Sequence, residues 1–459
     1  MIFNRNEQFE TNKMKTLILN ARIVNENDIK ELDLLIENGL ITQIEKDLQH
    51  KGVDEIIDAE NLYLLPGIID DQVHFREPGL TQKATIATES QAAVTGGVTS
   101  FMEMPNVVPP TTNMEAIKQK ISIAQSTSFA NFSFYIGATN DNITDLLALD
   151  DQLVCGVKVF MGASTGSLLV DDINALHSIF SSVKVPIVTH CEDNKTILEN
   201  YHKAKAKYGD EIPVSMHPSI RSADACEKST RLAISLAQEY GSDLHVLHIS
   251  TAQELKLFSN APIEEKRITA EVCVHHLWFN QDDYSKLGNL IKCNPAIKTK
   301  FDQQALIEAV NSNKLDIIAT DHAPHTIEEK MGNYSKAPAG IPLVQHSLLS
   351  LIDHFKQGKL TLETIVEKAC HNPAIRFAVK DRGFIREGYH ADLVLINLNK
   401  STTVSKDNIL YKCGWSPFLE HTFQSKIEKT IVNGRVIYDG KNVIPSNRLV
   451  FPLKFNRNY

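Results

Sequence analysis

Histidine and aspartate residues directly follow short apolar runs at several points in the chain. His190 follows PIVT and His248 follows HVL, while His74 and Asp321 occupy equivalent places after two further runs. A single histidine after a strand is more often structural, but several imidazoles and a carboxylate together are ligands that suit zinc. Catalytic zinc keeps one coordination position open for water. The pattern therefore predicts a metal centre that activates water.

Lys158 lies inside the apolar segment GVKVFMG. A lysine in such a segment is costly unless it is paired or modified. One interpretation is a buried ion pair, or a side chain that extends its amine to the surface. The other is a carbamate formed with CO₂, because burial beside cations lowers the pKa of the amine and leaves it nucleophilic. A carbamate has two oxygens and can bridge two metal ions.

Asp321 lies in the short loop TDHAPH, together with two histidines. Aspartate is favoured as a helix N-cap, which would be a purely structural role. Two metal ions about 3.5–4 Å apart can share a hydroxide. Asp321 could then take the proton of that hydroxide and deliver it to an amide nitrogen, as a general acid–base. The histidines in the same loop favour this catalytic interpretation.

A possible anion clamp surrounds these residues. Arg76 lies just beyond His74 in HFREPGLT, and arginine matches a carboxylate with two parallel hydrogen bonds. Asn106 and His325 follow two other strands and can also donate to a carboxylate. The structural alternatives are a surface salt bridge between Arg76 and Glu77, and a turn at Asn106. The functional interpretation predicts a substrate with a free carboxylate.

The elements that must position these residues alternate between β-rich and helical runs. This alternation predicts parallel βα units, and eight strands close a (β/α)₈ TIM barrel whose active site lies at the strands' carboxyl ends. Within residues 15–66 the short runs KTLILNARIVN, LDLLIENG, LITQIEK and NLYLL are expected strands. Together with the C-terminal segments HADLVLINL and KTIVNGRVIYDG they predict a small β-sandwich. The expected domains are 14–66 with 386–450, and 67–385. The expected barrel strands are 67–74, 98–104, 132–136, 155–160, 186–190, 244–248, 267–272 and 315–320.

Composition narrows the class of protein further. The 459 residues carry a net charge of −9 without a basic stripe, so nucleic acid is not an expected partner. No apolar run reaches a membrane-spanning length, and the polar first dozen residues lack the apolar stretch of a signal peptide. The seven cysteines include no C-x-x-C pair and are typical of reduced thiols in a cytoplasmic protein.

Other histidines and cysteines receive structural interpretations. His275 and His276 in EVCVHHLWF are expected to form a packed pair near the barrel mouth. A thiolate nucleophile needs an activating base within reach. A buried small side chain is therefore the preferred interpretation for a further set of residues, namely Cys191, Cys226, Cys273 and Cys293.

Several motifs, in order along the chain, resemble those of dihydroorotases in the amidohydrolase superfamily. They are PGIIDDQVHFREPG, EMPNVVPPTT, GVKVFMG, IVTHCED, CNPAIK, TDHAPHTIEEK and APAGIPLVQHSL. The resemblance extends from about residue 14 to residue 450. The strings REPG and TDHAPHTIEEK together are specific to dihydroorotases and their allantoinase relatives, whereas the other motifs mark the superfamily.

The resemblance implies reversible closure of N-carbamoyl-L-aspartate to L-dihydroorotate in pyrimidine biosynthesis, with a metal-bound hydroxide as nucleophile. It implies one or two zinc ions, and a homodimer is compatible with it. Asn294 and the backbone at Ala337 and Gly340 would contact the ring amides. The carboxylate would be held by Arg76, Asn106 and His325. The metal ligands would be His74, carbamylated Lys158, His190, His248 and Asp321.

The chain departs from the family at one ligand. The family pattern is Asp-x-His-x-His, but here Gln72 stands where the first histidine belongs. An amide is a weaker and harder ligand than imidazole. Asp71 should not replace it, because adjacent strand residues point to opposite faces. Three outcomes are open: a weakly held second metal, a single metal, or a non-catalytic assembly partner, for example of aspartate transcarbamoylase. An allantoinase-like or hydantoinase-like ring opener is also compatible, and Arg76 is the feature that discriminates.

Overall fold

The computed structural model describes residues 14–49, 52–162 and 168–457. The central part of the chain forms an eight-stranded parallel sheet whose strands follow one another in chain order. Val73 pairs with His322, and the His74 amide donates to His322 O at 2.7 Å, so the first and last strands also meet. The strands are β6 (Ile68–Val73), β7 (Val98–Glu103), β8 (Asn131–Gly137), β9 (Val154–Phe160), β10 (Ile187–His190), β11 (Leu244–Val246), β12 (Ile268–Cys273) and β13 (Ile317–Ala319).

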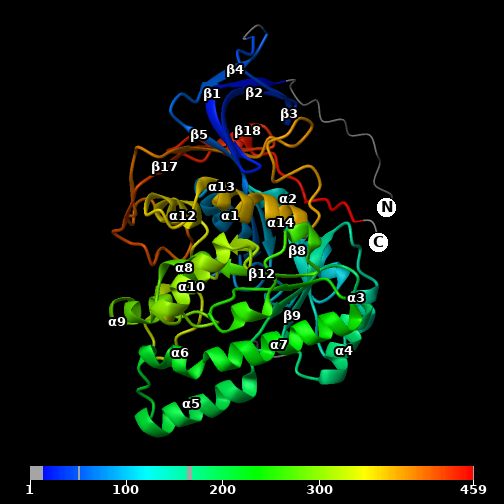
Figure 1. The fold of residues 1–459 in the computed structure, drawn as a ribbon, viewed down its shortest axis with the longest axis vertical. Helices are drawn as coiled ribbons and strands as arrows, with labels where there is room; N and C mark the ends of the chain where they lie inside the picture. The colour runs from blue at the N-terminus through cyan, green and yellow to red at the C-terminus, as the bar shows by residue number, and fades with distance from the viewer. Residues whose placement is uncertain (1–13, 50–51, 163–167, 458–459) are drawn as a thin grey trace.

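This sheet confirms the predicted TIM barrel. Each of the eight expected strands is present, with ends shifted by no more than two residues. Helices cover the outside of the barrel (Figure 1). The helices of the described residues are α1 (Ile86–Thr95), α2 (Met114–Thr127), α3 (Ile143–Leu147), α4 (Ile173–Ser182), α5 (Asn194–Tyr208), α6 (His217–Ile220), α7 (Ala223–Tyr240), α8 (Val274–Trp278), α9 (Tyr284–Leu287), α10 (Lys300–Asn311), α11 (Ile327–Lys330), α12 (Ser347–Lys356), α13 (Leu362–Val366) and α14 (Asn372–Arg376).

Local capping explains where several of these helices begin. The side chains of Thr85, Asn113, Ser222 and Thr299 each accept a hydrogen bond from a backbone amide in the first turn of α1, α2, α7 and α10, respectively. Such caps satisfy amides that have no partner inside the helix. Among the residues with assigned structure, no helix combines the length and apolar character needed to cross a bilayer.

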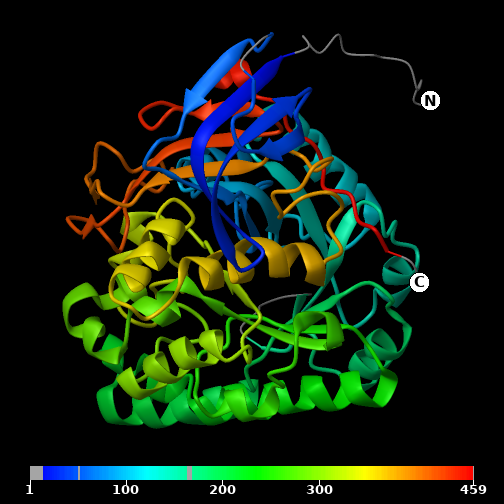
Figure 2. The same ribbon diagram turned by 45° about the horizontal axis from the view of Figure 1, so that its top comes forward.

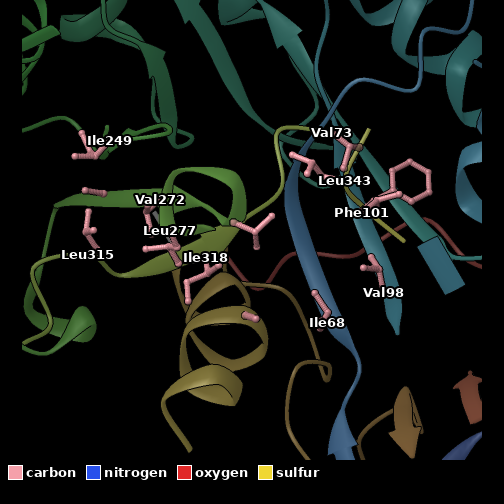
Figure 3. Close-up of a cluster of buried hydrophobic side chains, with 14 of the residues drawn as sticks. Ile68, Val73, Val98, Phe101, Ile249, Val272, Leu277, Leu315, Ile318 and Leu343 are labelled. Atoms are coloured by element: carbon pink, nitrogen blue, oxygen red, sulfur yellow. The ribbon is translucent and has the colours of Figure 1, made fainter. Parts of the chain in front are cut away.

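Apolar side chains on the outward face of the strands join the barrel to its helices. Figure 3 shows this cluster, in which Ile68 and Val73 of β6 lie near Val98 and Phe101 of β7. A second group in the same view contains residues from β12, β13 and the neighbouring loops and helices: Val272, Ile318, Ile249, Leu277 and Leu315. These side chains are all buried, which removes apolar surface from water and fixes the strands that carry the polar residues.

The amino-terminal end of the barrel, opposite the strands' carboxyl ends, is filled by residues of the C-terminal segment. We did not expect this segment there from the sequence. Leu453 and Phe455 pack with Tyr135 and Phe377 in one buried cluster. The backbone joins this contact, because the Leu453 amide donates to Phe132 O at 2.8 Å. Phe132 lies at the start of β8, so the C-terminal segment closes the amino-terminal end of the barrel.

The two ends of the chain share a second sheet. Its strand order is β18-β17-β14-β5-β1-β2-β3, with β4 beside β1. N-terminal and C-terminal segments meet where β5 pairs antiparallel with β14, and Figures 1 and 2 show the blue N-terminal strands beside the orange and red C-terminal ones. The sheet consists of β1 (Lys15–Asn25), β2 (Asp28–Glu37), β3 (Leu40–Glu45), β4 (Glu55–Asp58), β5 (Tyr63–Pro66), β14 (Leu393–Asn397), β17 (Lys426–Val432) and β18 (Arg435–Tyr438).

The pairing of the two termini is therefore confirmed, whereas β4 was not expected. A separate short pair links β15 (Thr402–Thr403) and β16 (Thr422–Phe423). The division into domains 14–66 with 386–450 and 67–385 stays a prediction.

Candidate active site

The expected metal ligands come from five barrel strands or the residues just after them. Lys158 lies in β9 and His190 ends β10, whereas His74, His248 and Asp321 follow β6, β11 and β13. All five side chains are buried. Because the carboxyl ends of parallel barrel strands meet on one face, the fold brings these residues together.

His74 and Asp321 form the first half of the site. His74 Nε2 lies 3.0 Å from Asp321 Oδ1, and His74 Nδ1 lies 2.7 Å from Asn106 Oδ1. Asn106, which we expected in the carboxylate clamp, thus orients this imidazole. Gln72 Nε2 donates to the same Asp321 oxygen at 3.1 Å. Gln72 therefore lies beside the expected ligands, with its amide nitrogen rather than its oxygen directed at the acid.

His190 and His248 form the second half. His190 Nδ1 lies 2.9 Å from His248 Nε2, and His190 Nε2 lies 2.9 Å from Glu192 Oε2. Although burial alone would raise the pKa of Glu192, Arg221 and His190 lower it to about 2. Glu192 is therefore ionised and orients His190, as carboxylates commonly orient metal-binding imidazoles. We did not single out Glu192 from the sequence; its position two residues after His190 was the signal.

Lys158 is buried in the same region, and its amine lies 4.6 Å from the ring centroid of Phe160. Burial lowers the pKa of this amine to about 8, against the opposing charges of Asp321 and Glu271. Burial also lowers the pKa values of the three expected imidazole ligands, His74, His190 and His248. The positive charge of Lys158 lowers each of these pKa values further, so the amine lies close enough to act on all three rings.

The donors fit a divalent metal ion. The lowered pKa values keep the imidazoles neutral, and neutral imidazole is the form that binds metal. His248 Nδ1 is buried and has no hydrogen-bond partner in the described parts of the chain. The residues that would hold metal are His74, Lys158, His190, His248 and Asp321.

Arg76 and His325 lie next to this centre, and their side chains are in contact with each other. Arg76 has a φ of 68°, and its Nε donates to Pro324 O at 3.1 Å. Its Nη2 lies 3.2 Å from His325 Nε2. Burial, followed by the charges of Arg76 and Lys83, lowers the pKa of His325 well below its ordinary value. Burial also lowers the pKa of Arg76 to about 10, which leaves the guanidinium charged at neutral pH.

Two buried amines hold the loop that carries Ala337 and Gly340. Lys330 Nζ donates to three backbone oxygens, including Gly340 O at 2.9 Å, and Lys292 Nζ donates to Ala337 O at 2.6 Å. Gly340 has a φ of 145°, and an added Cβ would lie 2.4 Å from Ala323 O. This position therefore requires glycine. We did not assign either lysine to this role from the sequence.

Asn294 lies at the edge of a cavity of about 270 Å³. Its Oδ1 is buried and has no hydrogen-bond partner among the residues placed by the structure. The same cavity is lined by His217, Arg221, Lys292, Tyr334 and Ala339, among others. Asn294 is thus brought to a polar hollow and is not in direct contact with Asp321 in this structure.

A second polar cluster lies inside the barrel. His245 Nε2 is 3.4 Å from Asp71 Oδ2 and 3.2 Å from Glu271 Oε2, and all three side chains are fully buried. Although burial opposes a charged ring, Asp71 and Glu271 raise the pKa of His245 above its ordinary value. Asp71 therefore faces His245 and not His74. This agrees with the expectation that adjacent strand residues point to opposite faces. Glu271 also accepts a hydrogen bond from the His248 amide at 3.2 Å.

Comparisons with known proteins agree with this geometry. The amidohydrolase family matches residues 63–437. A dihydroorotase of Methanosphaera stadtmanae is 33% identical over 91% of this chain and 95% of its own length, and a dihydroorotase of Anoxybacillus flavithermus is 32% identical over 93% and 99%. The structure of L-hydantoinase from Arthrobacter aurescens superposes with a TM-score of 0.91 at 25% identity, covering 96% of this chain and 99% of that one. This chain therefore belongs to the amidohydrolase family, as its motifs indicated.

Proposed function

We propose that this protein is a cytoplasmic dihydroorotase of pyrimidine (UMP) biosynthesis. It would close N-carbamoyl-L-aspartate to L-dihydroorotate with loss of water, and open the ring in the reverse direction. The observation that supports this most directly is the Arg76–His325 pair, 3.2 Å apart beside the His74–Asp321 pair. A charged guanidinium at this place suits a cyclic amide that also bears a carboxylate. The relatives named dihydroorotase support the same conclusion.

We propose that zinc is held by His74, His190, His248, Asp321 and a carbamate on Lys158. When bound, the metal lowers the pKa of water and polarises an amide carbonyl. Because Gln72 replaces an imidazole and directs its amide nitrogen at Asp321, we expect the metal nearer His74 to be held more weakly. The stoichiometry is then one or two ions per chain. A homodimer remains a prediction.

Asp321 is the residue that moves a proton. Its Oδ1 accepts from Gln72 Nε2 and lies 3.0 Å from His74 Nε2, so its position is fixed by two neighbours. In ring opening, water adds to the ring carbonyl carbon and Asp321 takes the proton of that water. The carbon–nitrogen bond then breaks, and Asp321 delivers the proton to the leaving nitrogen. Ring closure follows the same steps in reverse.

The remaining groups bind and orient the substrate. Arg76 and His325 would hold the carboxylate, with Asn106 acting through His74. Asn294 and the backbone at Ala337 and Gly340 would contact the ring amides. Because Lys292 and Lys330 fix that backbone, the loop can hold its polar groups in place before the substrate arrives.

Turnover of three substrates tests this proposal. Purified protein, supplied with bicarbonate and with zinc, cobalt or manganese, should open dihydroorotate and close carbamoyl-aspartate. It should turn over dihydrouracil and allantoin far more slowly, since neither ring carries a carboxylate for Arg76. Preference for dihydrouracil would instead indicate a hydantoinase-like enzyme. No turnover of any substrate, with no metal retained from zinc-replete medium, would favour the non-catalytic assembly role.

A further inference from the structure

Three potential metal ligands lie together at the carboxyl end of β12, and none has a role in the centre described above. Cys273 is the last residue of β12, and His275 and His276 lie in the first turn of α8. Cys273 Sγ and one ring nitrogen of each histidine are all within 4.8 Å of one another. All three side chains are buried. We expected the histidines to be only a packed pair, so this arrangement with a thiol needs a separate explanation.

His276 has a nitrogen suited to a metal ion. Its Nε2 lies 3.1 Å from Pro295 O, and a carbonyl can only accept, so Nε2 carries the proton. Nδ1 then has a free lone pair. This atom is buried and has no hydrogen-bond partner among the described residues. A buried polar atom without a partner destabilises the fold, and a bound cation would offset that cost.

Gln72 supplies an oxygen next to the same group. Cys273 Sγ lies 3.7 Å from Gln72 Oε1. In a tetrahedral zinc site the edge between a sulfur and an oxygen ligand is about 3.6 Å, given bond lengths of about 2.3 and 2.1 Å. In this structure the Cys273 thiol shares its proton between Gln72 Oε1 and Glu271 Oε1, each 3.7 Å away, and the sulfur–amide spacing also suits two ligands of one ion. The amide nitrogen of Gln72 is engaged with Asp321, which fixes the oxygen toward the thiol.

We propose that Cys273, His275 and His276 form a second metal site, distinct from the Lys158 centre, that takes a thiolate-preferring divalent cation such as zinc or cobalt, with Gln72 Oε1 as a neutral fourth ligand. Binding releases the Cys273 thiol proton to solvent, because the thiolate is the form that ligates metal. One glutamine thereby connects the two sites, through its nitrogen to Asp321 and through its oxygen to Cys273. The site does not depend on which substrate the enzyme uses.

Cobalt substitution tests this proposal directly. The metal-free protein is titrated with Co²⁺ and its near-ultraviolet spectrum is recorded. A thiolate bound to Co²⁺ gives an intense charge-transfer band, whereas the ligands proposed for the Lys158 centre are nitrogen and oxygen donors and give none. We expect the band in the wild type and its loss in Cys273→Ser, with one metal equivalent fewer per chain. Cys226→Ser is the matched control, since Cys226 is another buried free cysteine and should keep the band.

A second variant keeps the test decisive if Cys273→Ser folds poorly. His276→Gln should weaken cobalt binding in the charge-transfer titration at least tenfold while leaving the metal of the Lys158 centre in place. Absence of the band in the wild type, or its persistence in Cys273→Ser, overturns the proposal. Dihydroorotate turnover is assayed on the same samples: an inactive protein with an intact band refutes the proposed function and leaves this site standing.

Discussion

The lowered pKa of Lys158 leads to a quantitative prediction about its modification. Burial brings the pKa to about 8 from an ordinary value of 10.5. At neutral pH the free amine is therefore about 300-fold more abundant than in an exposed lysine. Since CO₂ reacts with the free amine, we expect rapid carbamate formation at Lys158. At fixed dissolved CO₂ its rate should rise with pH up to about 8 and then level off.

The assay follows the carbamate carbon by ¹³C NMR. Metal-free protein is prepared in CO₂-free buffer and given ¹³C-bicarbonate with and without zinc. One protein-bound carbamate signal should appear and should be absent from Lys158→Arg, because arginine stays charged. Lys120 is an internal comparison: it is equally buried, but its Nζ lies 2.6 Å from Glu103 Oε2, so it should remain unmodified.

Two results would refute this reasoning. A carbamate signal that persists in Lys158→Arg would place the modification elsewhere. A rate that keeps rising to pH 10 would mean that Lys158 has the pKa of an ordinary lysine, and burial would then not be activating it. In either case the bridging role proposed for this residue would have to be abandoned.

Three further predictions concern single substitutions. Arg76→Met should raise KM for dihydroorotate roughly 100-fold, about 2–3 kcal/mol for a lost charged hydrogen bond, with metal content unchanged; an unaltered KM in steady-state assays would contradict its assigned role. Gln72→His should tighten binding of the metal nearer His74, measured by chelator competition, and equal affinity would show that position 72 does not govern that metal. Lys158→Met should stabilise the metal-free protein at pH 7 by about 3 kcal/mol in urea unfolding, because it removes a buried charge whose pKa falls from 10.5 to about 8. For the same reason the metal-free wild type should become more stable between about pH 8 and 10.5, where the unfolded chain binds the Lys158 proton more strongly than the folded one, and a flat profile would count against this pKa.

Sequence reasoning located the barrel because its strands are continuous apolar runs, and such runs are typical of parallel strands buried on both faces. It also anticipated that residues such as His190 and Asp321 would converge, since this follows from strand direction alone. The strand β4 was missed because its EIID carries little alternation beyond a single buried isoleucine, Ile57.

Contacts between distant strands could not be anticipated. The orientation of the Gln72 amide depends on Asp321 and Cys273, which lie about 250 and 200 positions further along the chain. A periodic pattern carries no information about such pairings. The His245–Glu271 contact was hidden for a related reason, because a histidine within an apolar strand does not reveal whether an acid faces it from the next one.

The packing of Leu453 and Phe455 against Tyr135 and Phe377 affects how the protein can be made in the cell. Synthesis proceeds from the N-terminus, so all eight barrel strands leave the ribosome before Leu453 and Phe455 have been added to the chain. Until then the amino-terminal end of the barrel exposes apolar surface to water, and β5 gains its β14 neighbour late as well. A nascent chain in this condition exposes apolar surface that chaperones can bind, and the barrel is closed only once residues 453–455 have been synthesised.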